Sequence, residues 1–298
     1  MPSVRQSMVA LVTRRYPFYS GCGSLANHRL VQALAGAGTE TAWARVRGGN
    51  HVCAPLDDYV GRAVYYVGDL DRKITWVCSR LVRPGDTVLD IGANLGLVTF
   101  ILSALVGPTG TVHSFEPIPA MQELIERARD RNGATNIRLH KCALGAEQSV
   151  LSLSVPRGHA GSASFMAERR HADSDQIDVP VRTLSEVLDD EGIGPVRLVK
   201  IDVEGFEPQV LAGAEAHFSR NAPDAILFEL NEVPGTDGGV HPTLEFLGGL
   251  GYRFLSLPKR LVRMRAFPFD PAQPRTGHDF LAVRTDKYAE IAGRLRAR

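Results

Sequence analysis

The sequence predicts an α/β fold in which a seven-stranded, mostly parallel sheet carries helices on both faces. From about residue 75 onward, short apolar segments alternate with amphipathic ones, which is the order of parallel strands joined by crossover helices. A glycine-rich turn at residues 90–96 separates one such strand from the helix that follows it. The next predicted strand ends in an acidic residue, Glu116, as the second strand of a nucleotide-binding sheet commonly does.

The elements of this sheet are predicted from hydrophobic periodicity and from turn residues. Strands are expected near residues 86–91, 111–115, 136–141, 197–202, 224–230, 251–257 and 279–284. Helices are expected near residues 74–82, 95–105, 118–131, 183–191, 207–218, 243–249 and 288–298. We assign residues 75–298 to one sheet-containing domain.

A side hairpin is predicted as an insertion at about residues 146–182, between the third and fourth strands of the sheet. Its strands are expected at 150–155 and 177–181, and a loop rich in glycine, serine and alanine at 158–165 lies between them. Long loops of this kind often form a lid or a substrate shelf beside an active site. A mobile surface excursion is the alternative interpretation.

Residues 1–74 are interpreted as a helical cap followed by a hairpin. The apolar spacing at 25–34 predicts a helix, and the alternation at 51–67 predicts two strands with a turn at 56–62. Six arginines and a single acid, Glu40, lie within residues 1–50. We expect a solvated basic face, but such a segment also suits a membrane surface, an acidic substrate or a partner subunit, so a homodimer through this extension stays open.

The composition is that of a globular protein. The 298 residues are 44% hydrophobic and 22% charged, and the net charge of +1 argues against a general nucleic-acid binder. The four cysteines form no C-x-x-C pair, which indicates reduced thiols rather than disulfides or a zinc site. No apolar run reaches the roughly 18 residues of a membrane-spanning helix. The apolar stretch at 8–12 is too short for a secretion signal, so we expect a cytoplasmic protein.

The glycine-rich turn differs from the phosphate-binding G-x-G-x-x-G pattern. It reads D-x-G-x-N-x-G, with Asp90 before Gly92 and with Asn94 in place of the middle glycine before Gly96. A pyrophosphate favours glycine at that middle position and gains nothing from a neighbouring carboxylate. S-adenosylmethionine carries an ammonium, a sulfonium and one carboxylate, which suit Asp90 and the backbone N–H groups of the turn, while Glu116 suits its ribose diol. We therefore expect S-adenosylmethionine as the ligand; a tight turn with a helix-capping glutamate is the alternative.

Five blocks of the sequence resemble the FkbM-type family of S-adenosylmethionine-dependent methyltransferases. They occur in the family's order within about residues 55–285, at 85–96, Phe115-Glu116-Pro117, Ala143-Leu144-Gly145, Thr183-Leu184 and 200–207. The last block, K-I-D-V-E-G-F-E, is the most diagnostic because general dinucleotide-binding proteins do not carry it. The resemblance implies a class I methyltransferase fold and methyl transfer to a hydroxyl oxygen. Asp71 stands where family members often have glutamate, and about the first fifty residues lie outside the family block.

The resemblance also implies which residues contact the adenosyl ligand. Ala143 and Leu144 match the family's adenine-contacting stretch. Pro117 supplies a second apolar wall in this interpretation, with the capping of a helix as its alternative role. Asp202, which lies in the most diagnostic block, is counted among the ligand contacts as well.

Asp202 and Glu204 are the leading candidates for catalysis. They follow the fourth strand, beside the expected position of the methyl group, and alternation places both side chains on one side of an extended segment. Asp202 is expected to act as a general base or as an acceptor clamp. Glu204 is the second candidate, or it holds the loop through the amide of Gly205. Both acids could instead cap the following helix, and Lys200 can pair with either.

A metal site is an alternative use of Asp202, together with Glu229 and Asn231 at the end of the fifth strand. These side chains form an oxygen-rich set that suits a hard divalent cation. The spacing permits such a site without requiring it, and we expect activity without a metal. His159 in the insertion and His241 after the fifth strand are further candidates for the general base.

The expected function is methylation of a hydroxyl group on a small natural product, a sugar or a glycan. A nicotinamide-dependent oxidoreductase on a similar sheet is one alternative, which the missing G-x-G pattern and the 200–207 block argue against. A non-catalytic partner subunit that binds an adenosyl ligand is another, which the intact acids and glycines of the two motifs argue against. Methylation of nitrogen stays open, although the D-P-P-Y signature of base or amide N-methylation is absent.

Overall fold

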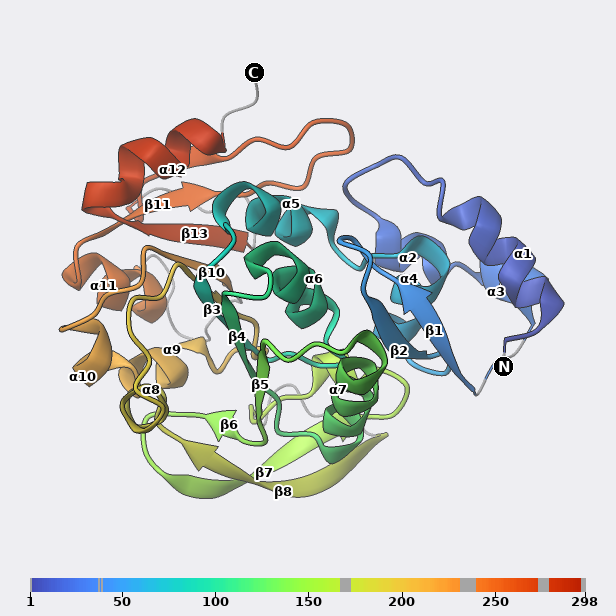
Figure 1. Ribbon diagram of the computed structural model, residues 1–298, viewed down its shortest axis with the longest axis horizontal. Coiled ribbons are helices and arrows are strands. Elements are labelled where there is room, and N and C mark those ends of the chain that lie inside the picture. The colour runs from blue at the N-terminus through green and yellow to red at the C-terminus, as the bar shows by residue number, and fades with distance from the viewer. Residues whose placement is uncertain are drawn as a thin grey trace.

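An eight-stranded sheet lies at the centre of the computed structural model, which describes residues 2–36, 38, 40–166, 173–230, 240–272 and 279–295 (Figure 1). In spatial order its strands are β12 (Phe267–Phe269), β11 (Tyr252–Ser256), β13 (Asp279–Arg284), β10 (Ala225–Glu229), β9 (Leu198–Ile201), β3 (Thr87–Ile91), β4 (Thr111–Phe115) and β5 (Ile137–His140). The strands from β10 to β5 are parallel, and β13 is antiparallel to both of its neighbours. The predicted α/β class and all seven predicted strands are confirmed, and β12 is an additional edge strand.

Helices pack on both faces of this sheet, as predicted. They are α5 (Arg72–Leu81), α6 (Leu97–Val106), α7 (Pro119–Asn132), α8 (Leu184–Asp190), α9 (Glu207–Ala212), α10 (Glu215–Phe218), α11 (Pro242–Gly249) and α12 (Tyr288–Arg294). Successive side chains of β9 enter two apolar clusters: Leu198 packs with α5, α6 and α7, and Val199 packs with α8, α9 and α11. The segment predicted as one helix at 207–218 forms two helices that meet at Gly213, where a Cβ would lie 2.0 Å from the Gly145 carbonyl oxygen.

The predicted side hairpin is present as part of a small second sheet. It comprises β6 (Ala143–Leu144), β8 (Ser174–Arg182) and β7 (Ser149–Pro156) in that order, and β7 and β8 are antiparallel with Leu151 opposite Val179. The 3₁₀ turn η1 (Ala160–Ser162) follows β7. Because β6 directly precedes the insertion and pairs with β8, the hairpin is attached to the sheet edge at the expected adenine-contacting residues.

The N-terminal segment differs from its prediction in three respects: the helix expected at 25–34 is divided into two helices, an unpredicted helix precedes them, and the second half of the hairpin is helical. It contains α1 (Val4–Thr13), α2 (Cys22–Ala26), α3 (Arg29–Ala35), β1 (Thr41–Arg45), β2 (His51–Pro55) and α4 (Tyr59–Val67). The hairpin is therefore β1–β2, and the predicted turn at 56–62 and second strand at 63–67 are wrong, because residues 59–67 form a helix. Asp58 starts α4 by accepting hydrogen bonds from the amides of Val60 and Gly61, and left-handed Gly68 ends it.

The N-terminal segment shares its apolar core with the sheet-containing part. Val52 and Val64 belong to the same cluster of buried side chains as Phe100 of α6 and Ile125 of α7. The two predicted domains, 1–74 and 75–298, thus share one apolar core, and the domain boundary at residue 74 remains a prediction. All four cysteines are buried and free of disulfides. Among the described residues, no helix has both the length and the apolar character to cross a bilayer.

Candidate active site

A cavity of about 810 Å³ opens at the carboxyl ends of β3, β4, β9 and β10, where parallel sheets bind their ligands. Among the residues proposed from the sequence, those that line it are Gly92, Asn94, Glu116, Pro117, Ala143, Leu144, His159, Asp202, Glu204 and Glu229. Asp90, Gly96 and His241 are described but do not line it, and Asn231 lies outside the described residues. The cavity therefore unites most, but not all, of the predicted site.

The glycine-rich turn after β3 lies against the end of β9. Gly92 has a φ of 76°, and a Cβ at this position would lie 2.0 Å from the Asp202 carbonyl oxygen, so no side chain fits. Asn94 adopts a φ of 51° and accepts a hydrogen bond from the Leu95 amide through Oδ1, at 2.6 Å. Gly96, with a φ of 89°, starts α6. The amides of the turn all donate within the protein: those of Gly92 and Ala93 to the Phe115 carbonyl, that of Asn94 to Glu116, that of Leu95 to Asn94 Oδ1 and that of Gly96 to the Ala93 carbonyl.

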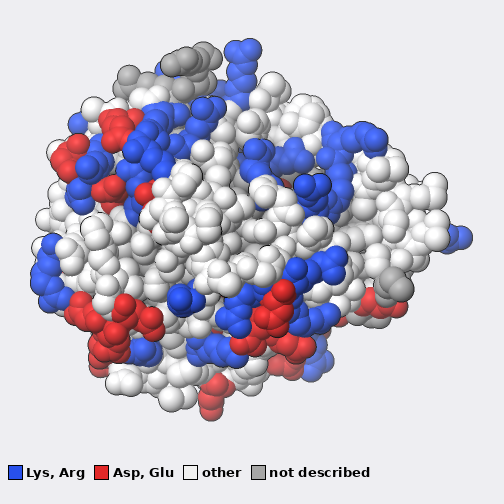
Figure 2. Space-filling model, viewed as in Figure 1, with Lys and Arg blue, Asp and Glu red and all other residues white. Residues whose placement is uncertain are grey.

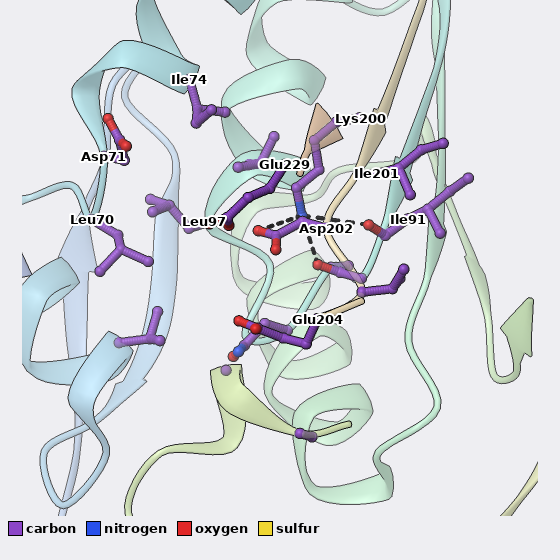
Figure 3. Close-up of a pocket in the computed structure, with 18 of the residues that line it drawn as sticks. Leu70, Asp71, Ile74, Ile91, Leu97, Lys200, Ile201, Asp202, Glu204 and Glu229 are labelled. Atoms are coloured by element: carbon purple, nitrogen blue, oxygen red, sulfur yellow. Dashed lines mark hydrogen bonds and ion pairs between the residues drawn. The ribbon is translucent and has the colours of Figure 1, made fainter. Parts of the chain in front are cut away.

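Lys200 connects this turn to both neighbouring aspartates, and Figure 3 shows its contact with Asp202. Its Nζ donates to the Gly92 carbonyl at 2.8 Å and lies 3.4 Å from Asp90 and 3.5 Å from Asp202. Burial alone would lower the pKa of Lys200, but the carboxylates of Asp202 and Asp90 raise it above its ordinary value. The side chain is therefore a buried ammonium that crosslinks the ends of β3 and β9.

Asp90 lies beneath the turn rather than in the cavity. Its side chain is fully buried and accepts a hydrogen bond from Thr99 Oγ1 of α6 at 2.6 Å. Burial raises its pKa, and the Lys200 ammonium opposes that shift. Asp90 therefore organises the turn and Lys200, and its expected contact with the cationic groups of a ligand stays a prediction.

Glu116 holds the second edge of the cavity. The side chain is 3% exposed, and its two oxygens accept hydrogen bonds from the Asn94 amide at 2.6 Å and from the Ile118 amide at 2.8 Å. Burial raises its pKa to about 7. Since each carboxylate oxygen has two lone pairs, both oxygens retain the capacity to accept a hydroxyl from a ligand.

The loop after β9 presents Asp202 and Glu204 to the cavity (Figure 3). The Asp202 side chain is 46% exposed, while its amide donates to the Ile91 carbonyl at 3.1 Å. Glu204 has a φ of 52°, and its carbonyl accepts a hydrogen bond from Ser164 Oγ of the insertion at 3.0 Å. No side chain caps α9, whose N-cap residue is Phe206, so the structure does not show the helix-capping alternative.

Glu207 is a site residue that the sequence analysis missed. Its Oε1 accepts hydrogen bonds from the amides of Val203 at 3.2 Å and Gly205 at 3.3 Å. The loop-holding contact that was considered for Glu204 is thus made by Glu207. An acid in the first turn of a predicted helix was the signal that could have identified it.

Three further acidic side chains, Glu229, Asp279 and Asp69, line the cavity. Glu229 ends β10, and burial, followed by the charges of Asp202 and Asp279, raises its pKa to about 8. Asp279 forms an ion pair with the buried Lys73. Asp69 accepts a hydrogen bond from Thr75 Oγ1 at 2.7 Å, and burial raises its pKa to about 6. Within the described part of the chain, no group of three or more His, Cys, Asp or Glu side chains is arranged to hold a metal ion.

Comparison with known proteins decides the family. Residues 90–254 match the model described as the methyltransferase FkbM domain. The chain belongs to the FkbM methyltransferase family.

Two relatives of this methyltransferase illustrate the range of similarity. The 31-O-demethyl-FK506 methyltransferase FkbM of Streptomyces tacrolimicus is 30% identical over 200 residues, which cover 57% of this chain and 74% of that protein. Methyltransferase 1 of Beauveria bassiana (strain ARSEF 2860) is 28% identical over 184 residues, which cover 55% and 73% of the two chains. Among solved structures, methyltransferase FkbM from Methylobacillus flagellatus KT aligns with a TM-score of 0.40 and 14% identity over 94% of this chain and 59% of that one.

S-adenosylmethionine is the methyl donor of this methyltransferase, and the residues present fit it. The buried Glu116 suits the ribose diol. The amides of residues 92–96, which the sequence assigned to the ligand's carboxylate, already donate to protein oxygens. Ala143 and Leu144 are buried in β6 and form an apolar wall with Ile118, which suits the adenine ring. These individual contacts are predictions that the geometry allows.

The N-terminal segment and the insertion close the methyltransferase site together. Asp58 Oδ2 accepts a hydrogen bond from the Ala160 amide at 2.9 Å, and the Tyr59 amide donates to the Gly158 carbonyl at 2.9 Å. The Tyr59 ring stands edge-on to His159, with ring centroids 4.6 Å apart. These contacts span about one hundred residues of sequence, which is why periodicity and motifs did not reveal them.

The two candidate histidines of the methyltransferase occupy different surroundings. His159 lines the cavity and contacts Ser162 Oγ through its ring nitrogen. His241 is buried at the start of α11, where its Nδ1 accepts a hydrogen bond from the Thr243 amide at 3.2 Å. A role as general base is a prediction for both, and only His159 lies at the cavity.

Proposed function

We propose that this methyltransferase transfers the methyl group to a hydroxyl oxygen of a small natural product, a sugar or a glycan. The observation that carries the proposal is the position of Asp202: a carboxylate open to the cavity, on a backbone anchored to the turn that follows β3. The name of the Streptomyces tacrolimicus relative, a 31-O-demethyl-FK506 methyltransferase, supports oxygen as the acceptor atom. Because the chain belongs to a methyltransferase family, we no longer consider an oxidoreductase or a non-catalytic binding subunit.

The bound donor supplies an already activated methyl on a positively charged sulfur, which leaves as a neutral thioether. What remains for the protein is to align the acceptor hydroxyl and to accept one proton. Asp202 is suited to accept that proton, because its carboxylate reaches the cavity while Lys200 fixes its orientation from behind. Glu204 presents a second carboxylate from the same loop, and His159 of the insertion lines the same cavity.

Product analysis tests this function directly. The protein is incubated with S-adenosylmethionine carrying a deuterated methyl group and with a panel of hydroxylated natural products and sugars, and the products are analysed by mass spectrometry and NMR. We expect a labelled methyl ether. A label on nitrogen or carbon would contradict O-methylation. In the same assay we expect activity to survive EDTA; loss that magnesium restores would instead make Asp202 and Glu229 metal ligands.

A further inference from the structure

The N-terminal helices expose apolar side chains that a helix packed on a protein core would bury. In α1, Gln6 and Ala10 face inward, whereas Val4, Met8 and Val12 are 78%, 64% and 69% exposed. An amphipathic helix in a globular protein normally buries its apolar stripe. α3, which packs against α1, likewise exposes its leucines, Leu30 and Leu34. These two helices therefore present apolar surface to the surroundings.

A distant loop extends the same surface. The amide of Tyr19 donates to the Leu261 carbonyl at 2.9 Å, and Ser20 Oγ donates to the Arg260 carbonyl at 3.0 Å, which joins the loop at 257–266 to the N-terminal segment. Leu261 and Val262 at its tip are 58% and 68% exposed. Figure 1 shows α1 running toward this loop. We call residues 2–36 together with residues 257–266 the N-terminal face.

Most of the exposed large apolar side chains in the described part of the chain lie on the N-terminal face. They are Val4, Met8, Leu11, Val12, Phe18, Leu30, Leu34, Leu261 and Val262; Val150 and Val240 are the two found elsewhere. Such a concentration marks an interaction surface rather than scattered exposure.

The charge of the N-terminal face is entirely positive. Its two segments contain eight arginines and lysines and no aspartate or glutamate, in a chain whose net charge is +1. Figure 2 shows the end of the molecule formed by α1 and α3 as largely white, with blue groups at its margin. A second copy of the chain is a poor partner, because a two-fold interface would place these cations against each other. An anionic lipid surface complements both the charge and the apolar side chains.

We propose that the N-terminal face docks on an anionic lipid bilayer, with its apolar side chains in the headgroup region and its cations against lipid phosphates. The same face borders the cavity, since Ser20, Gly21, Gly23 and Ser24 from one segment and Lys259 from the other line it. Docking would thus bring the cavity to an acceptor held at the membrane surface. This last step rests on the proposed function, whereas the docking itself does not.

Co-sedimentation with vesicles tests the docking. We expect the protein to bind vesicles of phosphatidylcholine with phosphatidylglycerol, to bind vesicles of phosphatidylcholine alone far more weakly, and to be released by salt. Val12→Glu should weaken binding by roughly tenfold, because it removes an apolar contact and adds repulsion. Val150→Glu is the matched control: Val150 is 67% exposed on β7, outside the N-terminal face, and this variant should bind like the parent.

Several results would overturn the proposal. These are no binding to phosphatidylglycerol vesicles at low salt, equal losses for Val12→Glu and Val150→Glu, or an unchanged Val12→Glu. A further contradicting result would come from sedimentation velocity without lipid, if the parent were a dimer and Val12→Glu a monomer. Calorimetry with S-adenosylhomocysteine is run on every variant. A parent that binds vesicles but not this ligand would contradict the proposed function and leave the docking intact.

Discussion

Asp202 combines a fixed backbone with a side chain that is open to the cavity, and this division makes its role testable. Asp202→Asn preserves the size of the side chain and removes only its charge and basicity. Because no side chain caps α9, we expect the fold and the affinity for S-adenosylhomocysteine to remain nearly unchanged. Turnover should fall by about 10²–10⁴-fold, the range expected for a lost acid–base group. Steady-state kinetics on a true acceptor measures turnover, and calorimetry measures the affinity for S-adenosylhomocysteine.

Comparable rates for Asp202→Asn and the parent would assign Asp202 to structure. The search for the base would then move to Glu204 and His159, which line the same cavity.

Glu116 makes donor binding dependent on pH. Its pKa of about 7 means that the free protein holds it partly protonated near neutrality, whereas ribose hydroxyls donate best to the ionised carboxylate. Affinity for S-adenosylhomocysteine should therefore rise as the pH rises through about 7, by roughly tenfold at most over two units. The effect on stability has the opposite direction: because folding raises the pKa of this carboxyl from 4.5 to about 7, its stabilising contribution is lost as the pH rises from about 4.5 to about 7. Calorimetry across this pH range tests the affinity.

Glu116→Gln is the control for this pH dependence. It should bind the ligand more weakly, by about 1.5–3 kcal/mol, and without the rise near pH 7. A rise that persists in this variant would identify another titrating group of the cavity, with Glu229 as the first candidate.

At the scale of elements, the turn after β3 depends on the absence of a side chain at one position. Gly92→Ala would place a Cβ against the Asp202 carbonyl oxygen, in addition to the cost of a positive φ. Gly133→Ala is the matched control, because Gly133 has a φ of 60° with nothing within 4 Å of the added Cβ. We expect the control to lose roughly 1 kcal/mol of unfolding free energy, and Gly92→Ala to lose at least twice as much together with donor binding. Denaturant titration and calorimetry measure the two quantities, and equal losses would refute the steric argument.

The two carboxylate oxygens of Asp58, which lies between α4 and η1, have different structural roles. Asp58 Oδ1 caps α4, whereas Oδ2 holds the Ala160 amide of the insertion. Asp58→Asn keeps an oxygen for the cap but cannot accept through its second group, so amide exchange at 158–164 should accelerate while stability stays nearly constant. Asp58→Ala should also lose about 1 kcal/mol of stability, because the cap disappears. Hydrogen–deuterium exchange read by mass spectrometry distinguishes the variants; unchanged exchange in both would show that the insertion is held by other contacts.

How well the elements could be predicted depended on the sequence range of the interactions that define them. The strands of the sheet and the turn at 90–96 follow from local periodicity and glycine placement, and the structure confirms them. The segment at 59–67 was misassigned because its apolar residues fit both an alternating and a helical pattern, and the cap at Asp58 decided in favour of the helix. At the site, Glu116 was predictable from its spacing to Asp90. Glu207 and Asp58 were not, since the amides they hold are defined by the folded loops.

On the scale of the whole molecule, the first fifty residues, which lie outside the family block, contribute to the site. Ser20, Gly21, Gly23 and Ser24 line the cavity, and Lys73 of α5 holds Asp279 of β13 across more than two hundred residues of sequence. Hydrophobic periodicity cannot reveal a contact over that range. The sequence also predicted no helix at the position of α1, whose side chains Val4, Met8 and Val12 are exposed. The architecture was thus predictable, whereas the enclosure of the cavity was not.

The position of β13 has a consequence for how the protein is made. This strand lies between β10 and β11 although it follows both in the chain. While the ribosome has yet to release residues 279–284, β10 presents an unpaired edge, and β11 has no neighbour through which to join the sheet. Until then, apolar residues such as Phe228 and Phe254 lack part of the cluster that buries them, and exposed apolar surface of this kind favours aggregation. Lys73 likewise finds Asp279 only then, so this ion pair at the cavity is among the last parts of the enzyme to assemble.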